Sequence, residues 1–284
     1  MDKASTDISI ARLSYSDIKS QAAKWYLTAA LAFLVVVLLH QFLLGAISYD
    51  LGYETHIHIS RVDSLPHTSI AWSTDTVAAL YIFPCILLLL ASFIVLMKLF
   101  YGDQAVTVKR WFLFWFMVFS VLMASALMSI SFLYKLDATE SLFQGFAVFV
   151  SWIGSGLMAP LLIFLVSSSI NLLFGFYSAR ILFNLMPILI RKRGKPARVK
   201  VMAAFFYPVF ALFLFAMLLT FPKYHYFFVV MFMHTALWFP GLFFINPTTL
   251  PRSNLKMAVS KNYDLYILVT VVTLIAILIQ VFLT

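Results

Sequence analysis

The chain has 284 residues, of which 63% are hydrophobic and 11% are charged, and its formal net charge is +9. About a quarter of the residues in an ordinary soluble domain are charged, so this chain lacks the polar side chains needed to cover its apolar surface in water. The composition excludes a typical soluble domain and predicts an integral membrane protein.

The N-terminal segment, residues 1–24, is polar and carries charges of both signs before the first apolar run begins. Its length and its acidic residues are untypical of a cleaved signal peptide. We therefore expect residues 1–24 to be a cytoplasmic segment and residues 25–284 to form a single transmembrane domain.

Seven apolar segments are long enough to cross a membrane, since a spanning helix needs about 20 mostly apolar residues. Backbone groups in lipid must be hydrogen-bonded within the protein, which favours helices over open strands. The predicted fold class is therefore an all-α, polytopic helical bundle with about seven transmembrane helices. The predicted spans are 25–47, 77–98, 111–134, 143–168, 201–221, 226–245 and 265–283.

The basic residues alternate between successive connecting segments. With seven spans, 17 of the 20 lysines and arginines fall on the side of the N-terminus. Because cytoplasmic loops are rich in these residues, the pattern predicts a cytoplasmic N-terminus and an external C-terminus, as in a bacterial inner membrane protein. The basic side would attract anionic lipid headgroups, and the positive charge is weak support for nucleic-acid binding.

The first outer loop, residues 48–76, contains two histidines in an alternating pattern. In "ETHIHIS", His56 and His58 alternate with apolar residues, which is the period of a strand and predicts a small hairpin. Two imidazoles on one strand face are a spacing used by zinc and copper sites, with His67 or Asp63 as a third ligand. The alternative is a solvated polar hairpin without metal, because two-ligand motifs often arise by chance.

Three further ionisable side chains fall inside predicted spans at similar depths: His40, Cys85 and His234. Such groups usually face the protein interior and are candidates for function. His40 and His234 could be the axial ligands of haem b, and Cys85 could join them around copper or zinc. The alternative is a structural role, in which a buried histidine hydrogen-bonds to a neighbouring helix.

The apolar stretch 143–190 is too long for a single span, because 48 helical residues would measure about 72 Å. Two spans would place the basic stretch 191–200 outside, against the charge distribution. We therefore expect one span, a break at "SSSIN" (167–171), and then an interfacial or cytoplasmic helix within the basic segment 171–200.

No catalytic motif is recognisable. The stretch "LLHQFLLG" has Gln41 and Leu44 where a metalloprotease helix needs glutamate and a second histidine. The sequence favours a non-catalytic subunit or accessory factor of a larger membrane complex, in contact with lipid and other membrane subunits. The alternatives are a metal- or haem-binding enzyme or electron carrier with its site near the outer face, and a transporter, although transporters commonly show internal repeats and midplane polar groups.

Overall fold

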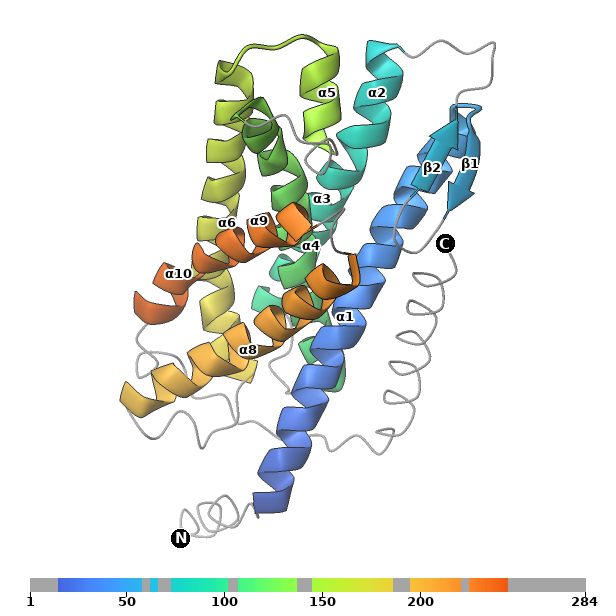
Figure 1. The fold of residues 1–284 in the computed structure, drawn as a ribbon. Coiled ribbons are helices and arrows are strands. Elements are labelled where there is room, and N and C mark those ends of the chain that lie inside the picture. The colour runs from blue at the N-terminus through green and yellow to red at the C-terminus, as the bar shows by residue number, and fades with distance from the viewer. Residues whose placement is uncertain are drawn as a thin grey trace, which may run out of the picture.

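The computed structural model describes residues 15–57, 62–65, 73–101, 107–136, 145–185, 195–220 and 225–244. These residues form a helical bundle with one two-stranded hairpin at one end (Figure 1). In chain order the elements are α1 (Tyr15–Asp50), β1 (Glu54–Ile57), β2 (Val62–Leu65), α2 (Thr74–Tyr81), α3 (Phe83–Tyr101), α4 (Val108–Leu136), α5 (Phe146–Trp152), α6 (Met158–Leu185), α8 (Lys195–Thr220), α9 (His225–Ala236) and α10 (Phe239–Phe244).

Six helical segments within the described ranges are long and apolar enough to cross a membrane, which confirms the predicted class of multi-pass helical bundle. Five predicted spans coincide with them to within a few residues, the fourth is displaced along the chain, and the seventh (265–283) lies outside the described residues. The six segments are Ala23–Asp50, Thr74–Tyr101, Val108–Leu136, Met158–Phe183, Val201–Leu218 and Phe227–Phe244.

The predicted helix break at 167–171 is wrong, because α6 continues through this stretch to Leu185. Residues 171–185 therefore belong to the spanning helix and not to a separate interfacial one. Ser167 and Asn171 do not end the helix because their side chains donate hydrogen bonds to its own carbonyls, those of Phe164 (2.8 Å) and Ser167 (2.9 Å) respectively.

The interruption lies earlier, between the short helix α5 and α6. Gly154 adopts a φ of 63° there, a left-handed conformation that favours glycine. The helix resumes at Met158, and Pro160 is tolerated in its first turn because the amide that proline lacks would have no partner there.

Helix α4 is the centre of the bundle. In its most apolar stretch 78% of the residues are buried, against 22–44% in the other five candidate spans. It packs antiparallel to α6, since Trp111 donates to the Leu185 carbonyl at one end and Ser129 contacts Ser167 further along. Helix α4 also packs against α1, α3, α5 and α9.

Helix α1 runs parallel to α4. The Trp25 ring of α1 stacks on Phe114 of α4 at 5.9 Å between ring centroids, and further along both helices Phe33 meets Phe119 at 5.3 Å. Trp25 also donates its Nε1–H to the Ala204 carbonyl of α8 at 2.8 Å, so it ties three helices together.

Helices α8 and α9 form an antiparallel pair that is inclined to α6 (Figure 1). Their aromatic side chains interlock, with the Phe210 and Phe232 ring centroids 4.5 Å apart. Helix α9 ends at Ala236 and α10 starts at Phe239, because Pro240 has no amide hydrogen to bond back to α9.

The outward side chains of α3, α6 and α8 are largely apolar, which is the surface a lipid-embedded protein needs. On α3 they recur at helical spacing and are 40–75% exposed (Phe83, Ile86, Leu90, Phe93, Ile94, Met97 and Tyr101).

Candidate functional site

The most concentrated group of buried polar side chains in the described structure lies where α4, α6 and α9 meet. The imidazole of His234 contacts the Ser129 hydroxyl through Nε2 at 2.7 Å and the Asn171 amide through Nδ1 at 3.3 Å. Ser129 and Asn171 are 0% exposed and His234 is 2% exposed. Together with Ser167 and Trp238, these residues are called the His234 cluster below.

The orientation of the Asn171 amide follows from its other partners. The indole Nε1–H of Trp238 can only donate, so the atom it meets at 3.0 Å is the Asn171 carbonyl oxygen, Oδ1. The amide nitrogen of Asn171 donates to the Ser167 carbonyl at 2.9 Å, and a carbonyl can only accept. Both contacts therefore place the Asn171 NH2 group toward His234.

The histidine tautomer follows in turn. Because Asn171 donates to Nδ1 of His234, that nitrogen carries no proton, and the neutral imidazole has its proton on Nε2. Nε2–H donates to the Ser129 hydroxyl, which donates to Ser167 Oγ at 2.5 Å. Ser167 donates to the Phe164 carbonyl at 2.8 Å, which ends the chain.

The cluster contains a serine beside a histidine, but its proton arrangement is the reverse of a catalytic pair. A histidine that activates a serine must accept the hydroxyl proton on an unprotonated nitrogen. Here the nitrogen facing Ser129 is the donor, and the serine proton already points to Ser167. The arrangement instead links three helices through saturated hydrogen bonds, which is the structural alternative for His234.

His40 lies on α1 and is 7% exposed. It shares a helix face with Val36 and Phe33, and Phe33 packs on both α4 and α8. Its Nδ1 is buried and has no hydrogen-bond partner within the part of the chain that the structure describes. A haem bound by His40 and His234 stays a prediction, and it would require His234 to release either Ser129 or Asn171.

Cys85 is buried in the first turn of α3, and its thiol donates to the Tyr81 carbonyl at 3.6 Å. Among the residues with described positions, no three histidine, cysteine, aspartate or glutamate side chains are grouped so that they could hold a metal ion. The predicted site combining Cys85 with His40 and His234 thus gains no support from the described geometry.

The hairpin in the first loop is formed by β1 and β2, which pair antiparallel and place His56 opposite Asp63. His58 and His67, the other predicted ligands, lie outside the described residues. The zinc or copper site proposed for this loop stays a prediction.

Comparison with protein-family models, with curated proteins and with solved structures finds no match for this chain. The roles of its residues are therefore inferred from their own contacts and chemistry.

Sequence reasoning identified His234 but missed its partners Ser129, Ser167, Asn171 and Trp238. Ser167 and Asn171 were visible as polar residues inside an apolar stretch, four positions apart and so on one face of a helix. Polar residues in a span usually face the protein interior and bond to neighbouring helices. That rule would have placed them in the bundle core.

Proposed function

We propose that the protein is a non-catalytic, multi-pass subunit or accessory factor of a larger membrane complex. The observation that supports this role best is the saturated His234 cluster. Its serine and histidine hold three helices together in the neutral, hydrogen-bonded state described above. A group committed in this way stabilises the bundle, and the protein would act through the surfaces that it presents to lipid and to other subunits.

The first test asks whether the lipid-facing helices contact other proteins. A photoreactive amino acid is placed at Leu90 on α3, Leu162 on α6 or Leu214 on α8, whose side chains are 54%, 61% and 55% exposed. Leu88, which is 0% exposed, is the matched buried control. We expect light-dependent protein adducts of defined mass from at least one exposed position in native membranes and none from Leu88.

The crosslinking result can contradict the proposal directly. If none of the three exposed positions yields a protein adduct, while the same positions crosslink efficiently to lipid, the protein has no stable lateral partner. The role as a complex subunit would then be wrong.

A second test addresses the catalytic alternative. An activated serine reacts with a fluorophosphonate probe because its oxygen is nucleophilic, whereas Ser129 donates its proton within the cluster. We expect the probe to label the Ser129→Ala variant and the unchanged protein to the same extent. Labelling at Ser129 would show that the cluster opens to a reactive form and would overturn a non-catalytic role.

The haem and metal alternatives are separated by an absorption spectrum and a metal analysis of the purified protein. A Soret band lost in His40→Ala would favour a haem protein. Stoichiometric zinc or copper lost in His56→Ala would favour the loop site. Colourless, metal-free protein supports the proposed role.

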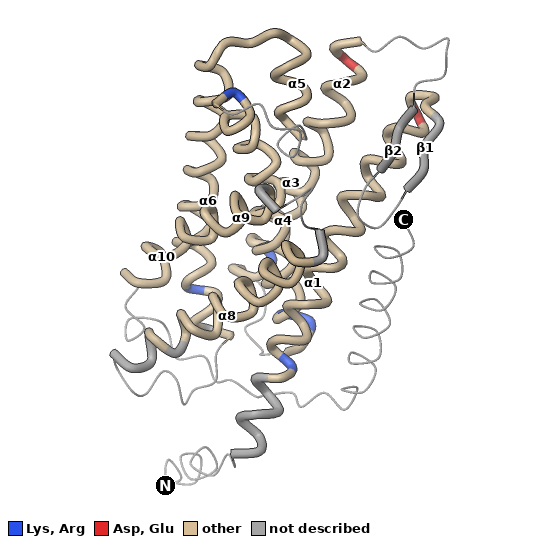
Figure 2. Tube along the Cα trace, viewed as in Figure 1, with Lys and Arg blue, Asp and Glu red and all other residues tan. Residues whose placement is uncertain are grey.

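We further propose that the N-terminal end of α1 faces the cytoplasm of a bacterial cell. Most of the described basic residues lie toward the end of the bundle where α1 begins, and the described acidic residues lie toward the other end, which also holds Lys135 in the last turn of α4 (Figure 2). The basic end includes Lys98 at the end of α3 and Arg110, which donates to the Leu99 carbonyl at 2.8 Å. This separation supports an inward basic end, and reporter fusions at residues 191–200 would test it.

A further inference from the structure

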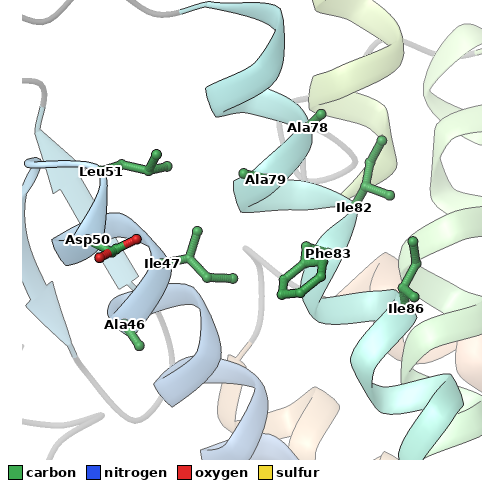
Figure 3. A pocket seen from close by; sticks show the side chains of 9 residues that line it. All are labelled: Ala46, Ile47, Asp50, Leu51, Ala78, Ala79, Ile82, Phe83 and Ile86. Carbon is green, nitrogen blue, oxygen red and sulfur yellow. The ribbon is translucent and has the colours of Figure 1, made fainter.

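A groove with a volume of about 750 Å³ opens between the end of α1 and the α2–α3 segment (Figure 3). Eight of its nine lining residues are apolar, and the ninth is Asp50. The lining residues are Ala46, Ile47, Asp50 and Leu51 on one side and Ala78, Ala79, Ile82, Phe83 and Ile86 on the other.

The groove is built by a change of direction between two helices. Helix α2 ends at Tyr81 and α3 begins at Phe83, followed by Pro84, which cannot donate a hydrogen bond to the preceding turn. Proline at such a point bends a helix. The small side chain of Ala79 lies on the side of α2 that faces α1, as the close-up shows (Figure 3).

Among the described residues that line the groove, the only charged group is the carboxylate of Asp50, and it lies where a helix favours a cation. Asp50 is the last residue of α1, and no basic residue lies in the last turn of that helix. The carbonyl groups at a helix C-terminus carry partial negative charge, so the carboxylate adds to a potential that is already negative. Figure 3 shows this carboxylate beside the groove. Electrostatic complementarity therefore calls for a cationic ligand.

The dimensions favour a small molecule over a transmembrane helix of another protein. Ligand pockets typically enclose about 300–1,000 Å³, and the volume of this groove falls in that range. A stable protein interface involves about 20–30 residues on each side, whereas nine residues of the described part of the chain line the groove. On its open side, Phe83 (49% exposed) and Ile86 (44% exposed) belong to the lipid-facing surface of α3, so a ligand can enter from the bilayer.

We propose that this groove binds a membrane amphiphile made of one alkyl chain and an ammonium headgroup. The chain lies between Ile47 and Phe83, and the ammonium group lies against the Asp50 carboxylate at the end of α1. This binding site is independent of whether the protein is a subunit of a complex.

The test uses photoreactive dodecylamine, with a diazirine in its chain, on the full-length protein in detergent. Crosslinked peptides are mapped by mass spectrometry, and unlabelled dodecylamine or dodecanol is added as competitor. We expect crosslinks to residues 46–51 and 78–86, and stronger competition by the amine than by the alcohol of equal chain length.

Two variants separate charge from shape. Asp50→Asn keeps the size of the side chain and removes its charge. It should weaken amine binding by up to about fivefold, the upper end of the range for an exposed ion pair, and leave dodecanol binding unchanged. Ala79→Trp fills the groove and should abolish crosslinking by the photoreactive amine. Thermal unfolding of both variants, followed through Cys85 labelling, verifies that they are folded.

Three results would overturn the proposal. The first is equal competition by amine and alcohol, and the second is unchanged amine affinity in Asp50→Asn. The third is a protein adduct in place of a lipid adduct when a photoreactive residue at Ala79 is activated in native membranes, since a partner helix would then occupy the groove.

Discussion

The close contact between α10 and α6 predicts a graded loss of stability when a single methyl group is added to a glycine. A Cβ atom built on Gly241 of α10 would lie 2.4 Å from the backbone carbon and oxygen of Gly175 on α6. Ordinary van der Waals contact begins at 3.4 Å, so Gly241→Ala would force the two backbones apart by about 1 Å. A backbone cannot rotate away as a side chain can.

The magnitude follows from two opposing effects. Alanine favours a helix over glycine by up to about 1 kcal/mol, whereas overpacking a well-filled interface costs about 1–3 kcal/mol or more. The clash involves backbone on both sides, so the upper part of that range applies. We expect a net loss of about 2 kcal/mol, equivalent to roughly 4–8 °C in Tm.

Two other glycines provide matched comparisons. A Cβ atom on Gly175 would lie 2.9 Å from the Cα atom of Trp238, about half the shortfall found at Gly241, so Gly175→Ala should cost about half as much. A Cβ atom on Gly156 would meet no atom within 4 Å, so Gly156→Ala should leave Tm unchanged.

The single cysteine supplies the assay. Cys85 is 1% exposed, so a fluorogenic thiol reagent labels it only when the protein unfolds. Tm is taken from the labelling curve of each variant in the same detergent. Tm should be highest for Gly156→Ala, lower for Gly175→Ala and lowest for Gly241→Ala. Equal Tm for all three would refute the close backbone contact between α6 and α10.

Two further predictions concern hydrogen bonds. Asn171→Leu removes the hydrogen-bond partners of Trp238 Nε1 and His234 Nδ1. Because interhelical hydrogen bonds in membranes contribute about 0.6–1.7 kcal/mol each, Tm should fall by several degrees in the Cys85 assay. Ser169→Ala, at an exposed position of the same helix, is the control and should leave Tm unchanged. Ser73→Ala removes the side-chain cap of α2, at a cost of about 1 kcal/mol. It should accelerate amide exchange in the first turn of α2 and lower Tm by no more than about 2–4 °C, and unchanged exchange in that turn would contradict the capping role.

The predicted architecture was accurate because it depends on a property that is summed over many residues. A run of about 20 apolar residues must cross the bilayer as a helix, whichever neighbours it meets. Five predicted spans therefore coincide with observed helices to within a few residues.

The fourth span was misplaced because the polar residues at 167–171 were interpreted as the end of a helix. Serine and asparagine at 167–171 compete for backbone hydrogen bonds and often mark helix ends. In a buried helix the same side chains can bond to their own preceding turn and to neighbouring helices, as Ser167 and Asn171 do. The interruption came instead at Gly154, whose positive φ cannot be read from the sequence alone, even though Gly156 and Pro160 follow closely.

The candidate site could be predicted only in part. A histidine within an apolar span is recognisable in the sequence, but the residues that it contacts depend on how the helices pack. Ser129 and His234 are 105 positions apart, and only the crossing of α4 and α9 brings them to 2.7 Å. Whether that contact is reactive or structural then depends on Asn171, through the tautomer it imposes. No pattern in the sequence encodes that orientation.

The His234 cluster and the end of α1 at Asp50 differ in whether their polar groups already have partners of suitable charge within the described structure. This difference determines where a ligand would bind. A ligand entering the His234 cluster would have to replace hydrogen bonds that are already formed, so its net gain would be small. At Asp50 the carboxylate adds negative charge to a helix end that already favours a cation. A cationic headgroup arriving there removes an unfavourable interaction and breaks no helix contact. Binding should therefore take place at the edge of the bundle, and its centre should hold the helices together.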